Sequence, residues 1–134
     1  MQAVLEKIVS ERKWHDKVFV DSCGINPSFL GSTPDRRMQE VAFLHGVSIH
    51  HRAKGFEESF FDQFDYILAA THDICKILNH PKCIISTEFS KKYFNKDIPD
   101  PYLDQLGGFE KSFEMISDAM QSFASHLEKK HHLQ

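Results

Sequence analysis

The chain has 134 residues, of which 41% are hydrophobic and 26% are charged, and these proportions are typical of a single globular domain with a buried core. Its net charge of -3 argues against a general nucleic-acid binder, because phosphate backbones are held by clustered lysines and arginines. Three cysteines are too few, and odd in number, for a disulfide framework, and no stretch resembles a membrane span or a signal peptide. We therefore expect a cytoplasmic protein that binds neither nucleic acid nor membranes.

The first third of the chain alternates helix and strand patterns. Apolar residues at helical spacing predict a helix over residues 1–14, and no capping residue precedes it, as though something upstream were absent. Residues 17–21 are β-branched and aromatic and predict a strand. Thr33 is placed to cap a helix that begins at Pro34 and stops at Gly46.

The same alternation continues through the second half. A short helix is predicted over residues 57–63, a buried strand over 66–70, a helix over 73–79 and a further strand over 83–86. The final helix carries an apolar stripe in steps of three and four residues, formed by Phe109, Phe113, Ile116, Met120, Phe123 and Leu127.

Short apolar strands alternating with helices predict an α/β fold with a parallel sheet flanked by helices. We expect one domain over residues 1–128, followed by a polar tail over residues 129–134. Ligands of such folds lie at the carboxyl ends of the strands, so the loops after the predicted strands are the places to look for a site.

One such loop, residues 98–102, has the sequence Ile-Pro-Asp-Pro-Tyr. Its two prolines restrict the backbone on both sides of Asp100, which suits a loop that aims one carboxylate. An ordinary surface turn is the alternative interpretation, because proline and aspartate are common turn residues.

Taken together, the order of short motifs resembles the low-molecular-weight protein-tyrosine-phosphatase family. The matching stretches are residues 20–24, Gly31 with 34–37, 51–53, 64–69, and 100–102 followed by 108–110. The resemblance implies a three-layer α/β/α fold. Thr71, Ile74 and Leu103 depart from residues that the family usually has, which bears on substrate preference and on the support of the site rather than on the fold.

The chemistry that this resemblance implies needs no cofactor and no metal. A loop cysteine attacks phosphorus to form a phosphocysteine, an arginine six positions later holds the phosphate oxygens, and an aspartate protonates the leaving phenol. The substrate is then a phosphotyrosine protein or a small aryl phosphate. By position, Asp100 matches the general acid, Ser22 and His51 match residues that support the phosphate loop, Tyr102 matches a wall of the substrate pocket, and Phe29 lies near a specificity position.

The nucleophile loop itself is missing from this sequence. Six residues after Cys23, Cys75 and Cys83 stand Phe29, Pro81 and Phe89, none of which is arginine. In the resembled family that loop and a central first strand come directly before the helix that here starts at Met1. We therefore expect the chain to be inactive by itself, and expect it either to close the resulting gap in the sheet or to fill it with a strand from another molecule, for instance in a dimer.

Two other functions stay open. The chain can be a non-catalytic binding or regulatory protein that retains part of a phosphate pocket. A third reading is an arsenate reductase-like protein, because Cys75 and Cys83 lie eight residues apart. Ala69 stands near the place where the first cysteine of such a pair is expected, which favours the phosphatase reading.

Overall fold

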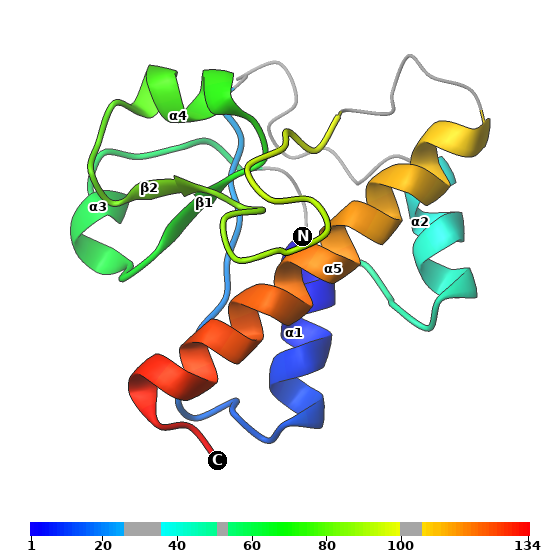
Figure 1. Ribbon diagram of the computed structural model, residues 1–134, viewed down its shortest axis with the longest axis horizontal. Coiled ribbons are helices and arrows are strands. Elements are labelled where there is room, and N and C mark those ends of the chain that lie inside the picture. The colour runs from blue at the N-terminus through cyan, green and yellow to red at the C-terminus, as the bar shows by residue number, and fades with distance from the viewer. Residues whose placement is uncertain (26–35, 51–53, 100–105) are drawn as a thin grey trace.

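The structure is a computed structural model that describes residues 1–25, 36–50, 54–99 and 106–134 (Figure 1). In chain order its elements are α1 (Gln2–Glu11), α2 (Arg36–Leu44), α3 (Phe60–Gln63), β1 (Ile67–Ala69), α4 (His72–Leu78), β2 (Cys83–Ile85) and α5 (Leu106–His131). No helix within these ranges is long and apolar enough to cross a membrane.

The described residues form a two-stranded parallel sheet, in which Ile67 of β1 pairs with Cys83 of β2. Helix α4 connects the two strands, as parallel pairing requires. Thr71 caps this helix by accepting a hydrogen bond from the amide of Ile74 at 3.3 Å. Asn79 ends the helix in the left-handed conformation, with φ 46°, which turns the chain back toward β2.

Helices cover both faces of this sheet. Helix α4 contacts both strands, whereas α1 and α5 pack on each other on the other side (Figure 1). Tyr66, Leu68 and Ala70 pack against the core that those two helices form. The arrangement agrees with the layered α/β fold that the sequence predicted.

The core lies mainly between α1 and α5. Trp14, Ala119, Met120 and Ala124 are at most 1% exposed. The apolar stripe predicted in the last helix supplies much of this core, because its spacing places those side chains on one face.

Helix α5 continues into the polar tail that was expected over residues 129–134, and ends at His131. Contacts with the rest of the domain hold this end of the chain. The ring of His131 contacts the hydroxyl of Tyr66 at 2.9 Å, and the indole N–H of Trp14 donates to the carbonyl oxygen of Gln134 at 3.2 Å. Leu133 packs against the core.

The strand predicted over residues 17–21 is the main error of the sequence analysis. These residues are not part of the sheet, although a neighbouring residue, Gly24, forms an isolated bridge with Gly55. A strand exists only where a neighbour accepts its hydrogen bonds, and a cavity separates this segment from β1. The predicted capping residue Thr33 and the helix start at Pro34 lie outside the described residues, and α2 is described from Arg36.

Candidate functional site

Five residues are predicted to form the site, and the structure describes one of them. Ser22 lies near the end of segment 17–23, which has no regular secondary structure beyond the turn at Lys17. Asp100, Tyr102, Phe29 and His51 lie outside the described residues. The geometry of the site is therefore built from the described residues that surround these positions.

Ser22 is fixed against the first turn of α1. Its hydroxyl donates a hydrogen bond to the side-chain oxygen of Gln2, and its amide donates to the carboxylate of Asp21 at 2.9 Å. Asp21 also forms an ion pair with Lys54. These contacts join segment 17–23, the start of α1 and Lys54, the residue just before the isolated bridge at Gly55, into one polar cluster.

Cys23 follows directly, but its surroundings do not activate a thiol. Partial burial and the negative charge of Asp21 raise the pKa of Cys23, and the opposing effect of Lys54 is smaller. Burial and a hydrogen bond to Cys75 raise the pKa of Cys83 to about 12. A nucleophilic cysteine needs the opposite shift, so neither thiol has the electrostatic setting of a phosphatase nucleophile.

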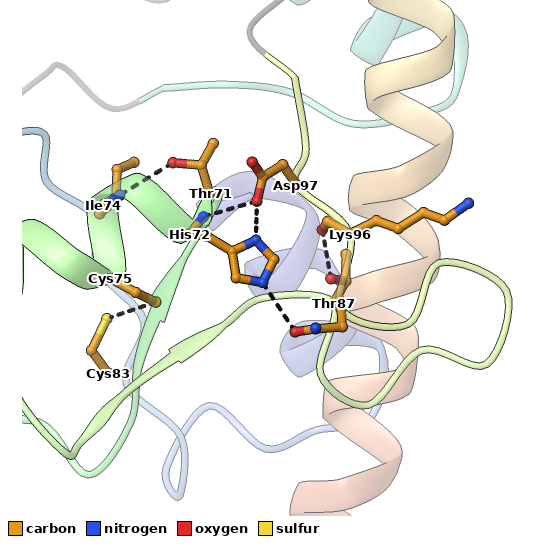
Figure 2. Close-up of polar contacts among 9 residues, drawn as sticks. Thr71, His72, Ile74, Cys75, Cys83, Thr87, Lys96 and Asp97 are labelled. Carbon is orange, nitrogen blue, oxygen red and sulfur yellow. Dashed lines mark hydrogen bonds and ion pairs between the residues drawn. The ribbon is translucent and has the colours of Figure 1, made fainter.

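A second polar cluster, formed around His72 at the start of α4, holds the chain just before Asp100 (Figure 2). The amide of His72 donates to the carboxylate of Asp97 at 2.8 Å, and the Nδ1 of the same histidine contacts that carboxylate oxygen. Its Nε2 lies 3.1 Å from the side-chain oxygen of Asn95. Both ring nitrogens thus face acceptor oxygens, which only the imidazolium form satisfies as a double donor.

The electrostatics agree with this geometry. Hydrogen bonds to Asn95 and Asp97 raise the pKa of His72. Hydrogen bonds from the backbone and ring of His72 lower the pKa of Asp97. The pair is exposed to solvent, so it orients the loop more than it stabilises the fold.

Two further hydrogen bonds hold the last residues before Asp100. The amide of Ile98 donates to the carbonyl oxygen of Ala70 at 2.8 Å, directly after β1. The hydroxyl of Ser112, a buried residue of α5, donates to the carbonyl oxygen of Pro99 at 3.0 Å. The chain is therefore attached to the carboxyl end of β1 and to α5 up to the residue before Asp100.

A cavity of about 490 Å³ lies between segment 17–23 and β1. Its walls are mainly apolar and include Leu5, Val18, Val20, Leu68 and Phe123. Strand β1 pairs with β2 on one edge only, so its other edge faces this space within the part of the chain that is described.

Met1 also lines the cavity, and burial lowers the pKa of its amine to about 6. At the cavity's edge the rings of Phe19 and Phe64 stack with centroids 6.1 Å apart. The cavity thus joins an apolar groove to a poorly hydrated amine at the start of α1.

Sequence reasoning missed His72, Asp97 and Ser112 as supports of the Asp100 loop. His72 had a usable signal, because it comes just after a predicted strand, where parallel sheets place their functional groups. Ser112 had none, since its partner Pro99 is brought to it only by folding. Within the described ranges, no three histidine, cysteine, aspartate or glutamate side chains come together as metal ligands.

Comparison with known proteins identifies the family. The model of the low molecular weight phosphotyrosine protein phosphatases matches residues 2–133. A putative low molecular weight protein-tyrosine-phosphatase of Synechocystis is 30% identical over a match that covers 84% of this chain and 77% of the relative. The low molecular weight phosphotyrosine protein phosphatase of Gallus gallus is also 30% identical, over 97% of this chain and 85% of the relative. A crystal structure of a protein tyrosine phosphatase from Entamoeba histolytica, 26% identical, covers 97% of this chain with a TM-score of 0.90, over 88% of its own chain. The resemblance read from the motifs is thereby confirmed, and the chain belongs to the low molecular weight protein-tyrosine-phosphatase family.

Proposed function

We propose that this domain provides the acid side of a phosphatase site that hydrolyses phosphotyrosine and other aryl phosphate monoesters through a phosphocysteine. The nucleophilic cysteine and the phosphate-binding arginine come from a loop outside the 134 residues, since no cysteine of the chain has an arginine six positions later. The 134-residue chain is then inactive by itself.

The observation that carries this proposal is the anchored segment before Asp100. Hydrogen bonds to Ala70, Ser112 and His72 attach residues 97–99 to the carboxyl end of β1, to α5 and to the start of α4. A general acid must stay within hydrogen-bond reach of the leaving oxygen, so the backbone that carries it must be firmly held. An ordinary surface turn has no need of attachments to three elements.

In the proposed reaction each predicted residue has one role. Asp100 gives its proton to the phenolic oxygen as the P–O bond breaks, and then takes a proton from the water that attacks the phosphocysteine. Ser22 and His51 support the phosphate loop, Tyr102 walls the aryl group, and Phe29 contributes to specificity. The polar contacts of Ser22 with the first turn of α1 support its share of this assignment.

We propose further that the cavity between segment 17–23 and β1 is filled by an extended strand that leads into the phosphate loop. Segment 17–23 and β1 form two of its walls, most of the side chains that line it are apolar, and β1 presents an unpaired edge there within the described residues. Such a site takes a strand through main-chain hydrogen bonds and alternate side chains. A second copy of the chain is the competing occupant, and it gives a dimer.

Two other functions compete with hydrolysis. A binding protein without turnover uses the same anchored loop but stays inactive when a nucleophile loop is supplied. An arsenate reductase-like activity has one supporting observation, because the Sγ atoms of Cys75 and Cys83 lie 3.4 Å apart.

A cytoplasmic location also stays a proposal, supported by the three cysteines, all of which are free thiols.

The test compares the 134-residue chain with a fusion that carries a family strand and a Cys–five residues–Arg loop ahead of Met1. We expect hydrolysis of p-nitrophenyl phosphate by the fusion and none by the chain. The matched control is the same fusion with serine in place of the loop cysteine, which must bind phosphate without turnover.

Each result decides between the candidates. A folded fusion that binds phosphate but shows no hydrolysis favours the binding protein, and one that reduces arsenate with thioredoxin favours the reductase. Hydrolysis by the 134-residue chain alone contradicts the proposal that the nucleophile comes from outside it. Size-exclusion chromatography tests what fills the cavity. If the 134-residue chain is a dimer and the fusion is a monomer, a second copy of the chain fills the cavity when the added strand is absent.

A further inference from the structure

We propose that Cys75 and Cys83 are an oxidation site, at which a hydroperoxide converts the two thiols into an intramolecular disulfide between α4 and β2. Their Sγ atoms lie 3.4 Å apart, and the S–H of Cys83 donates to the sulfur of Cys75 (Figure 2). A disulfide needs about 2.05 Å between the sulfurs, so they must approach by roughly 1.4 Å. This inference does not depend on the proposed phosphatase function.

Backbone hydrogen bonds in the turn between α4 and β2 hold the two cysteines next to each other. The left-handed Asn79 ends α4 with its amide bonded to the carbonyl oxygen of Cys75 at 2.9 Å. The amide of Cys83 donates to the carbonyl oxygen of His80 at 3.0 Å. Both cysteines are therefore tied into the same hydrogen-bonded turn, and the two thiols face each other across it.

The two sulfurs have different surroundings, which assigns an order to the steps. Burial and the hydrogen bond to Cys75 raise the pKa of Cys83 to about 12, so Cys83 keeps its proton at neutral pH. Its S–H group donates to the sulfur of Cys75, so the sulfur of Cys75 is the acceptor of the pair. Cys75 is then the thiol that attacks the peroxide, and Cys83 is the thiol that resolves the product.

The reaction balances with one hydroperoxide. The Cys75 sulfur attacks one peroxide oxygen, so an S–O bond forms, the O–O bond breaks, and the departing oxygen leaves protonated as water or an alcohol. Cys83 then attacks the sulfenic sulfur, so the S–S bond forms, the S–O bond breaks, and hydroxide leaves as water with the Cys83 proton. The two thiols lose two electrons and two protons, and the peroxide gains them.

The new bond fixes α4 to the first residue of β2. The same helix begins with His72, whose amide and ring hold Asp97 ahead of the Asp100 loop. Oxidation therefore restrains the element from which that loop is held.

The experiment treats the reduced 134-residue protein with hydrogen peroxide and measures its intact mass and tryptic peptides. Lys76 and Lys82 lie between the two cysteines, so trypsin separates them unless they are bonded. We expect loss of the mass of two hydrogens and a linked peptide pair that dithiothreitol splits. Cys75→Ser and Cys83→Ser must each abolish the linked pair, whereas the exposed Cys23→Ser is the matched control and must retain it.

The order of the steps has its own readout. Cys83→Ser must accumulate a sulfenic acid at Cys75 that dimedone traps, and Cys75→Ser must not trap at Cys83. A wild-type protein whose main product is a Cys23-linked dimer, or a sulfinic acid at Cys75 without the linked pair, overturns the proposal. Because the decisive mapping uses the wild-type chain, a variant that fails to fold leaves the test intact.

Discussion

Two regions of this domain differ in how closely their apolar side chains pack. We call the region of α1 and α5 the helical half and the region of β1, α4 and β2 the sheet half. Between α1 and α5, side chains such as Trp14, Ala119 and Met120 are at most 1% exposed. Around β1, apolar side chains including Val20 and Leu68 instead line a cavity of about 490 Å³.

The difference follows from how the two kinds of element satisfy their backbone groups. A helix makes its hydrogen bonds within one segment, so α1 and α5 need only bury their apolar stripes against each other. A strand makes its hydrogen bonds with a neighbour, and the described residues give β1 one neighbour. The same apolar composition thus yields a closed core on one side and an open edge on the other.

The largest expected effect concerns Asp100, in the fusion whose added strand is proposed to fill the cavity of the sheet half. In the fusion that carries the nucleophile loop, we expect Asp100→Ala to lower turnover by about 10²–10⁴-fold while KM changes little, because the acid acts in the transition state. Stopped-flow or steady-state assays with an aryl phosphate measure this, and the exposed Asp16→Ala is the control. An unchanged turnover removes Asp100 from the mechanism, and in the 134-residue chain the substitution must have no measurable effect.

The free energies of unfolding of core variants from the two halves can be compared directly. Met120→Ala in the closed core is expected to lower the free energy of unfolding by about 2–5 kcal/mol, because it leaves a cavity that the packed helices cannot fill. Leu68→Ala, at the cavity wall, is expected to cost less, and Phe19→Ala, whose side chain is 78% exposed, about 0.5 kcal/mol or less. Urea unfolding measures all three, and equal costs for Met120→Ala and Leu68→Ala contradict the contrast between the halves.

The smallest effect is expected in the 134-residue chain by itself and concerns the buried amine of Met1, whose pKa is lowered to about 6 from a usual value near 8. Between these values the unfolded chain binds a proton that the folded chain does not, so the free energy of unfolding rises with pH from about 6 to about 8. The rise is at most about 3 kcal/mol. Urea unfolding at several pH values measures it, and acetylation of the amine must remove this part of the pH dependence. A slope that survives acetylation belongs to other groups.

Much of the fold was predictable from local sequence. The apolar spacing in α1 and α5 predicted both helices, because a helix buries whichever stripe its period of 3.6 residues creates. The short apolar runs predicted β1 and β2, and the order of motifs led to the family that the comparisons confirm. Asp100, Tyr102, Phe29 and His51 were selected by that resemblance and stay predictions.

The contacts between distant residues were decided only by the tertiary structure. Residues 17–21 have a strand's composition but do not join the sheet, because pairing depends on a neighbour and not on the segment itself. His72 meets Asp97, and Ser112 meets Pro99, only after β1, α4 and α5 have assembled. The sequence by itself therefore determined the helices, the apolar strands and the family. Folding decided which polar groups meet and which edge of β1 has no partner among the described residues, since both depend on the distance between segments rather than on their composition.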